Sequence, residues 1–403
     1  MPSMQQPDES TALVLPMTRN PSGTSWQPDS TPMRGVHLSA GDWAFMLHGA
    51  VSAGYDDQLG NRGGDRFLST NWFMGMAQHP LWGGEAQLRG MLSLEPLTIP
   101  GEGFPLLLQS GESYRGVHLH DRQHPHDFVM EASFTYRRPL SDWLGAELYL
   151  APVGEPALGP APFMHRASAD GDPFPPLSHH WQDSTHISFG VATAALYTRQ
   201  VKLEASWFNG REPDDNRWNF DFDTLDSFAV RLSANPVRPV SLQVSYGYLD
   251  NPEAASSPPG AKLSVSRVTG SISVSLPLPM VQIDSTLAWG RNISVTALDS
   301  FLFETNFDLD GVNAPFVRLE AVQKTAHDLD VPGFSGSQAL AQSYLLTSAV
   351  LGFVRSFPRL GPVEPALGIR VSVGRVPDDL DALYGSRAVF GGYVYLFLRA
   401  SRQ

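Results

Sequence analysis

The stretch "VKLEASWF", residues 201–208, alternates strictly between apolar and polar side chains. Its apolar members are Val201, Leu203, Ala205 and Trp207, and its polar members are Lys202, Glu204 and Ser206. A period of two is typical of a β-strand with one apolar and one polar face. Lys202 and Glu204 put full charges on the polar face. Only the other face of this strand is therefore suited to an apolar environment.

The same period recurs along almost the whole chain from Gly41 onward, for example in "SLQVSYGYL" at residues 241–249. We predict sixteen strands from it. They cover residues 42–55, 68–78, 85–95, 127–137, 143–152, 186–197, 200–208, 226–235, 240–249, 262–275, 280–291, 300–308, 316–325, 339–354, 363–375 and 388–400.

The connections between these strands alternate in length. Short ones hold proline or other turn residues, as in "RPLSD" and "NPVRP". Seven short turns on one side and eight longer loops on the other indicate an even-stranded, closed, antiparallel barrel with both chain ends on the periplasmic side. The longer loops are predicted at residues 56–67, 96–126, 153–185, 209–225, 250–261, 292–299, 326–338 and 376–387.

We therefore predict an all-β fold, a closed antiparallel transmembrane β-barrel of about 16 strands with long extracellular loops. The barrel would span residues 41–403, with the loops 96–126 and 153–185 folded into or across its mouth. Residues 1–40 are rich in Pro, Ser and Thr, and we expect a flexible, periplasmic tail there. A soluble β-protein is the alternative, because alternation alone does not say which face is buried.

Aromatic residues near the predicted strand ends favour the membrane barrel, where such residues form girdles at both interfaces. They are Trp43, Tyr55, Trp72, Trp143, Trp207, Tyr248, Trp289 and Tyr393. The last strand, "AVFGGYVYLFLRASRQ", places Tyr393, Tyr395 and Phe397 on one face. It resembles the C-terminal strand by which outer-membrane barrels are recognised for insertion, although it continues beyond these aromatic residues.

Composition excludes several classes of protein. The formal net charge of −13 and the lack of a basic stripe argue against a nucleic-acid partner. The absence of cysteine excludes disulfides, thiolate metal sites and a cysteine nucleophile. The sequence as written shows no basic segment followed by an apolar core, so no secretory signal peptide is present in it. If the protein is exported, either the signal has been removed or the start of the sequence is misplaced.

Histidines and acids gather in two neighbouring loops. The segment "HLHDRQHPHDF", residues 118–128, holds four of the chain's 12 histidines, and four more follow between residues 165 and 186. Neutral imidazole is the commonest transition-metal ligand, so these residues are candidates for holding a divalent cation or copper, the one cofactor that the sequence suggests. The candidate ligands are His118, His120, His124, His126, Asp127, His179, His180, Asp183 and His186.

Two other interpretations compete with a metal site. Hydrogen-bonded His, Asp and Arg side chains also build loops that narrow a porin-like pore, and the proline-rich residues 159–177 suit a rigid loop. The candidates for lining such a pore are Asp121, Arg122, Glu131, Glu155, His165, Arg166, Arg318 and Glu320. A catalytic site would pair Ser178 or Ser184 with His186, but the chain has no G-x-S-x-G motif, and we predict no enzyme.

The N-terminal methionines add a further option, because Met1, Met4, Met17 and Met33 offer thioether ligands for a soft ion such as Cu(I). Loop strings such as "GTSWQPDSTPM", "DRQHPHD", "PVGEPALGP" and "SHHWQDSTHISFGV" resemble a family of uncharacterised bacterial outer-membrane β-barrel proteins. The resemblance implies a porin-like barrel in the outer membrane. Relatives often carry a tail rich in Met and His, which links the family to copper or other heavy metals; the tail of this chain has the methionines without the histidines.

The sequence thus predicts a bacterial outer-membrane, porin-like barrel for the passage or binding of a small polar solute or ion. The alternative is a metal-binding or resistance protein that captures copper or another divalent cation with the loop histidines. An outer-membrane enzyme is the third possibility. The expected partners are the lipid bilayer and the solute or metal ion, and formation of a homo-oligomer is left open.

Overall fold

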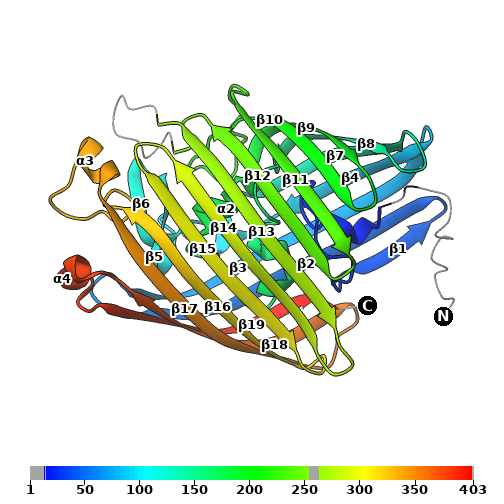
Figure 1. Cartoon of the computed structure of the whole chain (residues 1–403). Helices are drawn as coiled ribbons and strands as arrows, with labels where there is room; N and C mark the ends of the chain where they lie inside the picture. The colour runs from blue at the N-terminus through cyan, green and yellow to red at the C-terminus, as the bar shows by residue number, and fades with distance from the viewer. Residues whose placement is uncertain (1–12, 14, 254–262, 402–403) are drawn as a thin grey trace.

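The chain folds into one closed antiparallel β-barrel, which confirms the predicted fold class (Figure 1). The computed structural model describes residue 13, residues 15–253 and residues 263–401. Within these residues, sixteen strands form the wall. Each strand pairs with the next, and the last strand pairs with the first from Gly391 opposite Gln58 to Arg399 opposite Ala50, so the wall has no free edge.

All sixteen predicted strands are present, with ends shifted by a few residues. The wall strands are β2 (Trp43–Gln58), β3 (Gly64–Leu81), β4 (Gly84–Leu92), β7 (Val129–Pro139), β8 (Gly145–Gly154), β9 (Ser188–Tyr197), β10 (Val201–Phe208), β11 (Ser227–Val237), β12 (Val240–Leu249), β13 (Val265–Pro277), β14 (Gln282–Ile293), β15 (Ala297–Asp308), β16 (Asn313–Thr325), β17 (Ser343–Ser356), β18 (Val363–Arg375) and β19 (Ala388–Ala400).

The structure decides which face of each strand is buried. On β10, the charged side chains of Lys202 and Glu204 point inward and are 0% and 1% exposed, whereas Leu203 and Trp207 point outward and are 58% and 63% exposed. A soluble protein would bury the leucine and expose the charges. The outer face of the barrel is therefore suited to lipid, and the soluble alternative is excluded. Among the described residues, no helix is long and apolar enough to cross a membrane.

Two loops are shorter than predicted. Residues 56–67 and 292–299 were expected to be long connections, but the strands continue and leave only residues 59–63 and 294–296 between them. At the first of these loops, Asp56, a polar residue, still pairs with Tyr393 of β19 and with Arg66 of β3. Strand pairing thus extends past the apolar part of the strand, which a prediction from apolar alternation does not detect.

Short helical segments cover the loop end of the barrel. The segment α3 (Gly336–Ala341) replaces the beginning of the predicted strand 339–354, and the 3₁₀ segment η5 (Asp378–Leu380) leads into α4 (Asp381–Tyr384). In Figure 1, α3 and α4 lie at the same end. Their buried side chains Ala339, Leu380 and Tyr384 belong to one apolar cluster with residues of the barrel and the plug loop.

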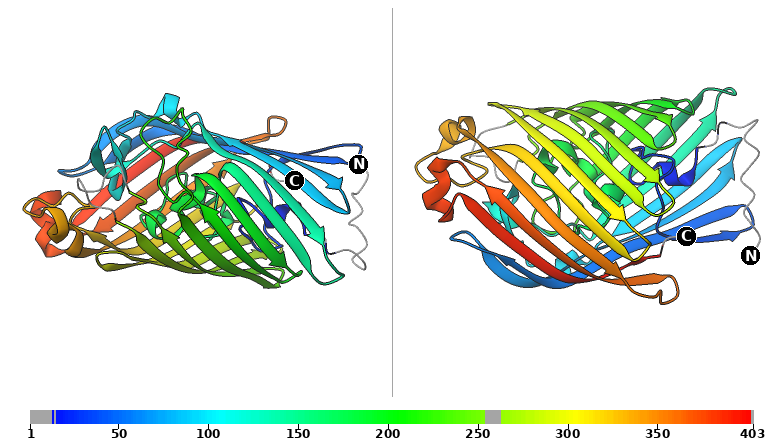
Figure 2. Two further views of the ribbon diagram at one scale, coloured as in Figure 1. Left: turned by 90° about the horizontal axis from the view of Figure 1, so that it is seen from above. Right: turned by 60° about the horizontal axis from the view of Figure 1, so that its bottom comes forward.

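Three segments enter the interior of the barrel (Figures 1 and 2). The first, which we call the N-terminal segment, is residues 15–33 and includes the 3₁₀ segment η1 (Met17–Arg19). The second follows the short helix α1 (Glu95–Thr98) and is a hairpin of β5 (Phe104–Tyr114) and β6 (Val117–Gln123), which forms a sheet of its own. The third, which we call the plug loop, is residues 155–187. Its helical segments are η2 (Phe163–His165), η3 (Ala167–Ala169), α2 (His179–Gln182) and η4 (Ser184–His186).

The hairpin was not predicted within the loop 96–126. Only "VHLHDRQ" at residues 117–123 shows alternation that is strong enough to suggest a strand, whereas nearly all of β5 is buried on both faces. Because β5 and β6 pair only with each other, β4 pairs directly with β7 in the wall. The short strand β1 (Val36–Ala40) pairs with the start of β2, from Trp43 to Leu47. The rest of the same side of β2, from Ala50 to Gln58, pairs with β19.

The N-terminal segment is held inside the barrel. Thr24, Ser25 and Trp26 are buried, and the main-chain carbonyl of Thr24 accepts a hydrogen bond from Lys202 on the wall. The prediction of a flexible tail therefore does not hold for residues 15–33, because charged side chains of the wall bind the main chain of this segment. Residues 1–12, including Met1 and Met4, lie outside the described residues.

Two predicted aromatic groups point inward rather than toward the membrane. Tyr393, Tyr395 and Phe397 of β19 are buried, and the ring of Tyr393 stacks 4.6 Å from that of Phe174 in the plug loop. Trp72 of β3 also borders the interior. Aromatic side chains here fill the space between the wall and the plug loop. Alternation in the sequence does not distinguish such an inward-facing aromatic residue from one that faces lipid. Trp43, Tyr55, Trp143 and Trp207 are exposed on the outer surface, as expected for a girdle.

Candidate functional site

The interior of the barrel is lined by charged side chains that pair with one another. Arg231 on β11 lies 2.9 Å from Glu204 on β10, and Lys202 lies 3.1 Å from the same carboxylate. Five strands farther along the wall, Arg318 of β16 lies 3.1 Å from Glu304 of β15. Buried charges of this kind are stable only when they are paired. The lumen therefore has a polar wall in which neighbouring strands share ion pairs.

The plug loop is attached to this wall by further ion pairs. Arg166 lies 2.7 Å from Glu304 and also pairs with Asp183 inside the loop. Asp172 lies 3.0 Å from both Arg318 and Arg370, which stand on β16 and β18. Because these contacts reach separate parts of the wall, the loop crosses the lumen instead of resting on its rim.

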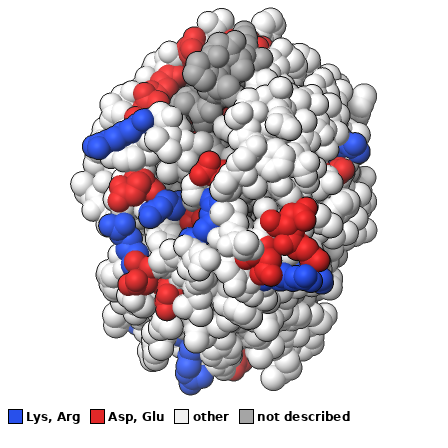
Figure 3. All heavy atoms as spheres, turned by 90° about the vertical axis from the view of Figure 1, so that its left-hand side faces the viewer, with Lys and Arg blue, Asp and Glu red and all other residues white. Residues whose placement is uncertain are grey.

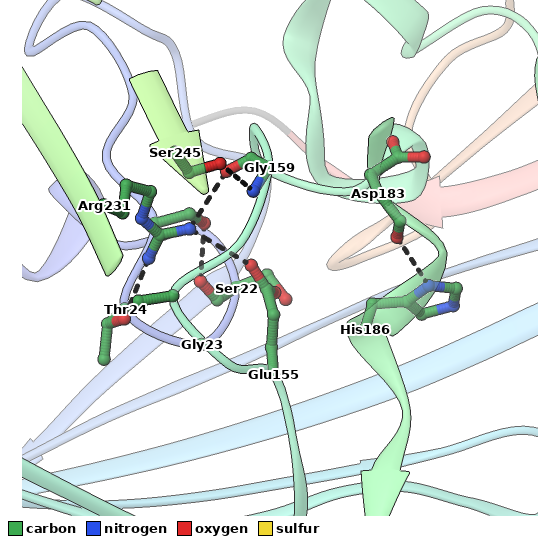
Figure 4. A network of polar contacts seen from close by, with 12 residues as sticks. Ser22, Gly23, Thr24, Glu155, Gly159, Asp183, His186, Arg231 and Ser245 are labelled. Carbon is green, nitrogen blue, oxygen red and sulfur yellow. Dashed lines mark hydrogen bonds and ion pairs between the residues drawn. The ribbon is translucent and has the colours of Figure 1, made fainter. Parts of the chain in front are cut away.

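The plug loop and the N-terminal segment meet at Arg231 (Figure 4). The guanidinium of Arg231 donates to the carbonyl of Gly159 at 3.1 Å and to the hydroxyl of Thr24 at 2.9 Å. The main-chain amide of Gly159 in turn donates to Ser245 of β12 at 2.9 Å. Glu155 lies 3.8 Å from Arg231. Burial raises the pKa of Glu155 to about 7. One arginine thus joins the wall to both inserted segments.

Little space is left between the inserted segments and the wall. A cavity of about 120 Å³ lies beside the N-terminal segment and the plug loop, and it is bordered by His48, Trp72, His165 and Arg399 among others. This volume is room for a few water molecules. Seen from the loop end, acidic and basic side chains gather close together on this face of the molecule (Figure 3). In this conformation the N-terminal segment and the plug loop occupy the lumen around this cavity.

The two histidine-bearing loops do meet. The ring of His126, after β6, lies 5.4 Å from that of His186 in the plug loop, and His124 lies 6.2 Å from His180. His179 is 5.1 Å from His186, measured between ring centres. The five rings form a buried group, which we call the histidine cluster. Its members are His124, His126, His179, His180 and His186.

Each ring of the cluster is oriented by an oxygen acceptor or a carboxylate. Nδ1 of His126 lies 2.8 Å from Glu95, and that of His180 lies 2.9 Å from Glu212. His179 and His186 bind through Nδ1 to the side chain and the carbonyl of Asp183, at 2.6 Å and 3.1 Å. The Nε2 atom of His124 lies 3.0 Å from Glu112. The Nε2 atoms of His126, His180 and His186 are buried and have no hydrogen-bond partner among the described residues.

The histidines of the cluster differ in the direction in which their pKa values are shifted. Burial alone lowers the pKa of His126 and His180, but the facing carboxylates of Glu95 and Glu212 outweigh burial and raise both pKa values above the ordinary one. Burial dominates at His179, whose pKa falls to about 4, and at His186, whose pKa falls well below its usual value. His126 and His180 therefore favour ion pairs with their carboxylates, whereas His179 and His186 favour the neutral form.

His118 and His120 lie in a different place from the cluster. The ring of His118 stacks 4.8 Å from that of His327 in the loop after β16, and Nε2 of His120 lies 3.4 Å from Asp330. Asp127 pairs with Arg217 at 3.4 Å. The nine predicted ligands are thus split between two groups. As the side chains stand, no set of three or more His, Asp or Glu residues is arranged to hold a metal ion in the part of the chain that the structure describes.

The predicted pore-lining residues are placed inside the barrel or its loops. Glu131 lies 3.3 Å from Arg89, and Asp121 lies 2.7 Å from Arg62. Glu320 accepts a hydrogen bond from the hydroxyl of Ser178 at 2.8 Å, so that serine is engaged with a carboxylate rather than with His186. The side chain of Arg122 donates to the carbonyl of Gly103 at 3.3 Å. The places of Glu155, His165, Arg166 and Arg318 are given above.

Sequence reasoning missed several residues of the site. Glu95 and Glu212 hold two histidines, and Asp172 joins the plug loop to the wall, yet no motif in the sequence links any of these acids to its partner. In "FVMEASFTYR", residues 128–137, a period of two predicts that Met130 lies on the apolar outer face with Ala132 and Phe134. A β-bulge, in which Val129 and Glu131 pair with Leu92 and Met91 while Met130 is left between them, turns this methionine inward. No pattern in the sequence marks that bulge.

Comparison with solved structures finds the same architecture in bacterial outer-membrane porins and channels. The anion-selective porin from Comamonas acidovorans matches with a TM-score of 0.50 and 10% identity, over 89% of this chain and 99% of that chain. Salmonella typhi OmpF, in a complex with daunomycin, matches with a TM-score of 0.53 and 8% identity, over 90% and 100%. The outer membrane channel DcaP of Acinetobacter baumannii matches with a TM-score of 0.51 and 9% identity, over 92% and 100%.

These likenesses define the class of fold, which is that of the 16-stranded outer-membrane porins. Neither a protein-family model nor a curated protein sequence matches the chain. At identities of 10% or less, the shared architecture says nothing of the solute.

Proposed function

We propose that the protein is a porin-like barrel of the bacterial outer membrane that passes or binds a small polar solute or ion. One observation carries this proposal: a closed barrel with an apolar outside encloses a wall of paired charges around a narrow cavity. Pore width and the charges that line a pore set its selectivity. The architecture shared with porins and channels supports the same function. Because the lumen lies within one chain, the proposal does not require a homo-oligomer.

The plug loop is the element that would control passage. Two positions near its ends, Gly159 and Gln182, lie in close contact. A Cβ added at Gly159 would lie only 1.9 Å from the carbonyl oxygen of Gln182. The intervening residues 160–181 can therefore be excised and Gly159 joined to Gln182 through one or two glycines. The cut removes Arg166 and Asp172 with their contacts to the wall, while the strands stay complete.

Single-channel conductance in planar bilayers tests the proposal. We expect small conductance steps for the wild-type protein and much larger steps for the variant without residues 160–181. Passage of sugars of graded size into liposomes should rise in parallel. Heat-modifiable electrophoretic mobility shows whether each variant is a folded barrel. If the folded excision variant conducts no ions, the barrel is not a channel and the proposal fails.

A metal-binding histidine cluster is the second candidate. Nδ1 atoms held by carboxylates or a carbonyl, with Nε2 atoms left unpaired, are the arrangement by which proteins orient imidazoles toward a metal. Two imidazoles on one ion have ring centres about 5 Å apart, from metal–nitrogen bonds of about 2.1 Å. The separations of 5.1 Å and 5.4 Å are near this value. The rings would still have to turn for three nitrogens to converge.

Metal analysis of detergent-purified protein after incubation with Cu(II) or Zn(II) tests this candidate. A bound ion should be near-stoichiometric in the wild-type protein and absent after alanine replacement of His124, His126, His179 and His180. His79, which lies against Trp43 on the wall, provides the control substitution. If the wild-type protein binds no ion, or the His79→Ala variant loses as much metal as the fourfold variant, the cluster is a structural part of the plug.

A further inference from the structure

Methionines are concentrated in one region of the lumen. The chain has eleven methionines. Five of them form a buried cluster on four neighbouring wall strands, and three more pack against it from the N-terminal segment and the plug loop. The cluster is Met46, Met74, Met76, Met91 and Met130, and the three that pack against it are Met17, Met33 and Met164. Elsewhere the inner wall carries paired charges or, on β19, the aromatic side chains of Tyr393, Tyr395 and Phe397, so this patch of thioethers differs from the rest of the lumen.

Two imidazoles and an indole share this region. Nε2 of His48, on β2, lies 3.0 Å from the sulfur of Met74 on β3. Nε2 of His165 is shielded from solvent and has no hydrogen-bond partner in the described part of the chain. The ring of Trp72 lies 5.1 Å from that of His48 and 4.7 Å from that of His165. These groups border the cavity of about 120 Å³ together with Met33, Met130 and Met164.

Methionine also serves as an adaptable filler of irregular space, and such packing is the simplest explanation of the cluster. Packing alone does not explain the two imidazoles. A buried nitrogen that faces a thioether, or that faces nothing, loses the hydrogen bonds it would have in water.

The carboxylates around the cavity are already engaged. Asp170 lies 2.8 Å from Arg399, Asp172 lies 3.0 Å from Arg370, and Glu95 lies 2.8 Å from His126. Hard cations such as Mg²⁺ and Ca²⁺ need oxygen ligands of this kind. The donors that the cavity offers are instead sulfur and imidazole nitrogen, which select soft ions such as Cu(I).

We propose that this methionine cavity binds a soft monovalent cation, Cu(I) or Ag(I), through the thioethers of Met74, Met130 and Met164 and the imidazoles of His48 and His165. Ligand atoms around a tetrahedral metal stand about 3.6 Å apart when the bonds are about 2.1 Å to nitrogen and about 2.3 Å to sulfur. The pair His48 and Met74 is already close to that separation. A shift of the flexible Met74 side chain adjusts the distance. None of its five ligands belongs to the histidine cluster, although His126 of that cluster also borders the cavity. The proposal stands whether or not the barrel conducts ions.

Binding of Ag(I) to the detergent-purified full chain, in chloride-free buffer, is the direct test. Equilibrium dialysis with metal analysis should find about one Ag(I) per chain. Leucine at Met74 and Met130 nearly conserves volume, so the Met74→Leu, Met130→Leu variant should stay folded yet bind at least about tenfold more weakly. The control is Met280→Leu, because Met280 is exposed at a turn far from the cluster. Anaerobic Cu(I) should give sulfur scattering in its X-ray absorption spectrum.

Three results would overturn the inference. The first is no Ag(I) bound by the wild-type protein. The second is equal binding by the double leucine variant and the Met280→Leu variant. The third is loss of Ag(I) on alanine replacement of His124 and His180, which would assign the ion to the histidine cluster. If the double variant gives no heat-modifiable band, Met164→Leu on the plug loop replaces it, since that residue lies outside the barrel wall.

Discussion

Arg166 of the plug loop lies 2.7 Å from Glu304 of β15, and both side chains are buried inside the barrel. The same carboxylate also binds Arg318 at 3.1 Å and the hydroxyl of Ser168 at 2.9 Å. Glu304 therefore joins the wall to the loop through two donors, Arg166 and Ser168, and joins the neighbouring strands β15 and β16 through Arg318. Whether the lumen is constricted depends on contacts of this kind rather than on the strands.

Replacing Arg166 by alanine should loosen the plug loop. Removing one partner of a buried ion pair typically costs about 3–5 kcal/mol, because the other charge stays buried. We expect a loss of this order in the free energy of unfolding, measured with guanidinium in lipid vesicles, and a larger single-channel conductance. Arg387→Ala is the control, since its ion pair with Asp378 at 3.0 Å is exposed and worth at most about 1 kcal/mol. Equal effects of the two substitutions would contradict this role of Arg166.

The hairpin of β5 and β6 should depend on the close approach of Gly111 to the histidine cluster. A Cβ at Gly111 would lie 2.2 Å from Nε2 of His180, so Gly111→Ala must displace that ring. Gly116→Ala is the matched control, because Gly116 also has a positive φ but its added Cβ meets nothing within 4 Å. We expect faster tryptic cleavage after the exposed Arg115 in the first variant only. Similar cleavage rates would show that backbone strain, and not the contact with His180, matters.

A charged residue introduced on the outer face in the middle of a strand should destabilise the barrel. Leu287 stands at the centre of β14 and is 53% exposed to the outside. An arginine near the bilayer midplane destabilises such barrels by about 2–4 kcal/mol, and one near the interface by about 1 kcal/mol or less. Leu287→Arg should therefore lower the free energy of unfolding in lipid vesicles far more than Leu309→Arg, in the turn between β15 and β16. A tolerated arginine at Leu287 would place that surface in water.

Stability should decrease as the pH rises through the titration of Glu155. Burial raises the pKa of this carboxyl to about 7, above the value of about 4.3 in an unfolded chain. Between these values the folded protein holds a proton that the unfolded chain has released, so raising the pH favours unfolding by roughly 1.4 kcal/mol per unit. The contribution is fully present below about pH 4 and lost above about pH 7.

The Glu155→Gln variant should lack this decrease and be more stable than the wild-type protein at pH 8. Guanidinium midpoints at pH 5 and pH 8 measure the difference, with Glu102→Gln in an exposed part of a loop as the control. Parallel pH profiles of the wild-type protein and the Glu155→Gln variant would show that Glu155 has no raised pKa.

Much of the barrel follows from local patterns. In "VKLEASWF", the alternation of Lys202 and Glu204 with Leu203 and Trp207 is set by the pleat of a strand, which needs no knowledge of distant residues. Strand number and antiparallel order follow in the same way from the spacing of turns. The meeting of the two histidine loops was also predictable, because consecutive long loops of an antiparallel barrel lie side by side.

The sequence by itself thus determined the strands, their number and most of the residues that share a face, since these depend on a period of two along the chain. Tertiary structure alone decided what fills the lumen. The bulge that turns Met130 inward, the carboxylate of Glu95 beside His126, and the bond from Lys202 to the main chain of Thr24 all join residues that are far apart in sequence or break the local period. Such contacts arise from packing inside a closed wall, where buried charges must find partners wherever the chain brings them.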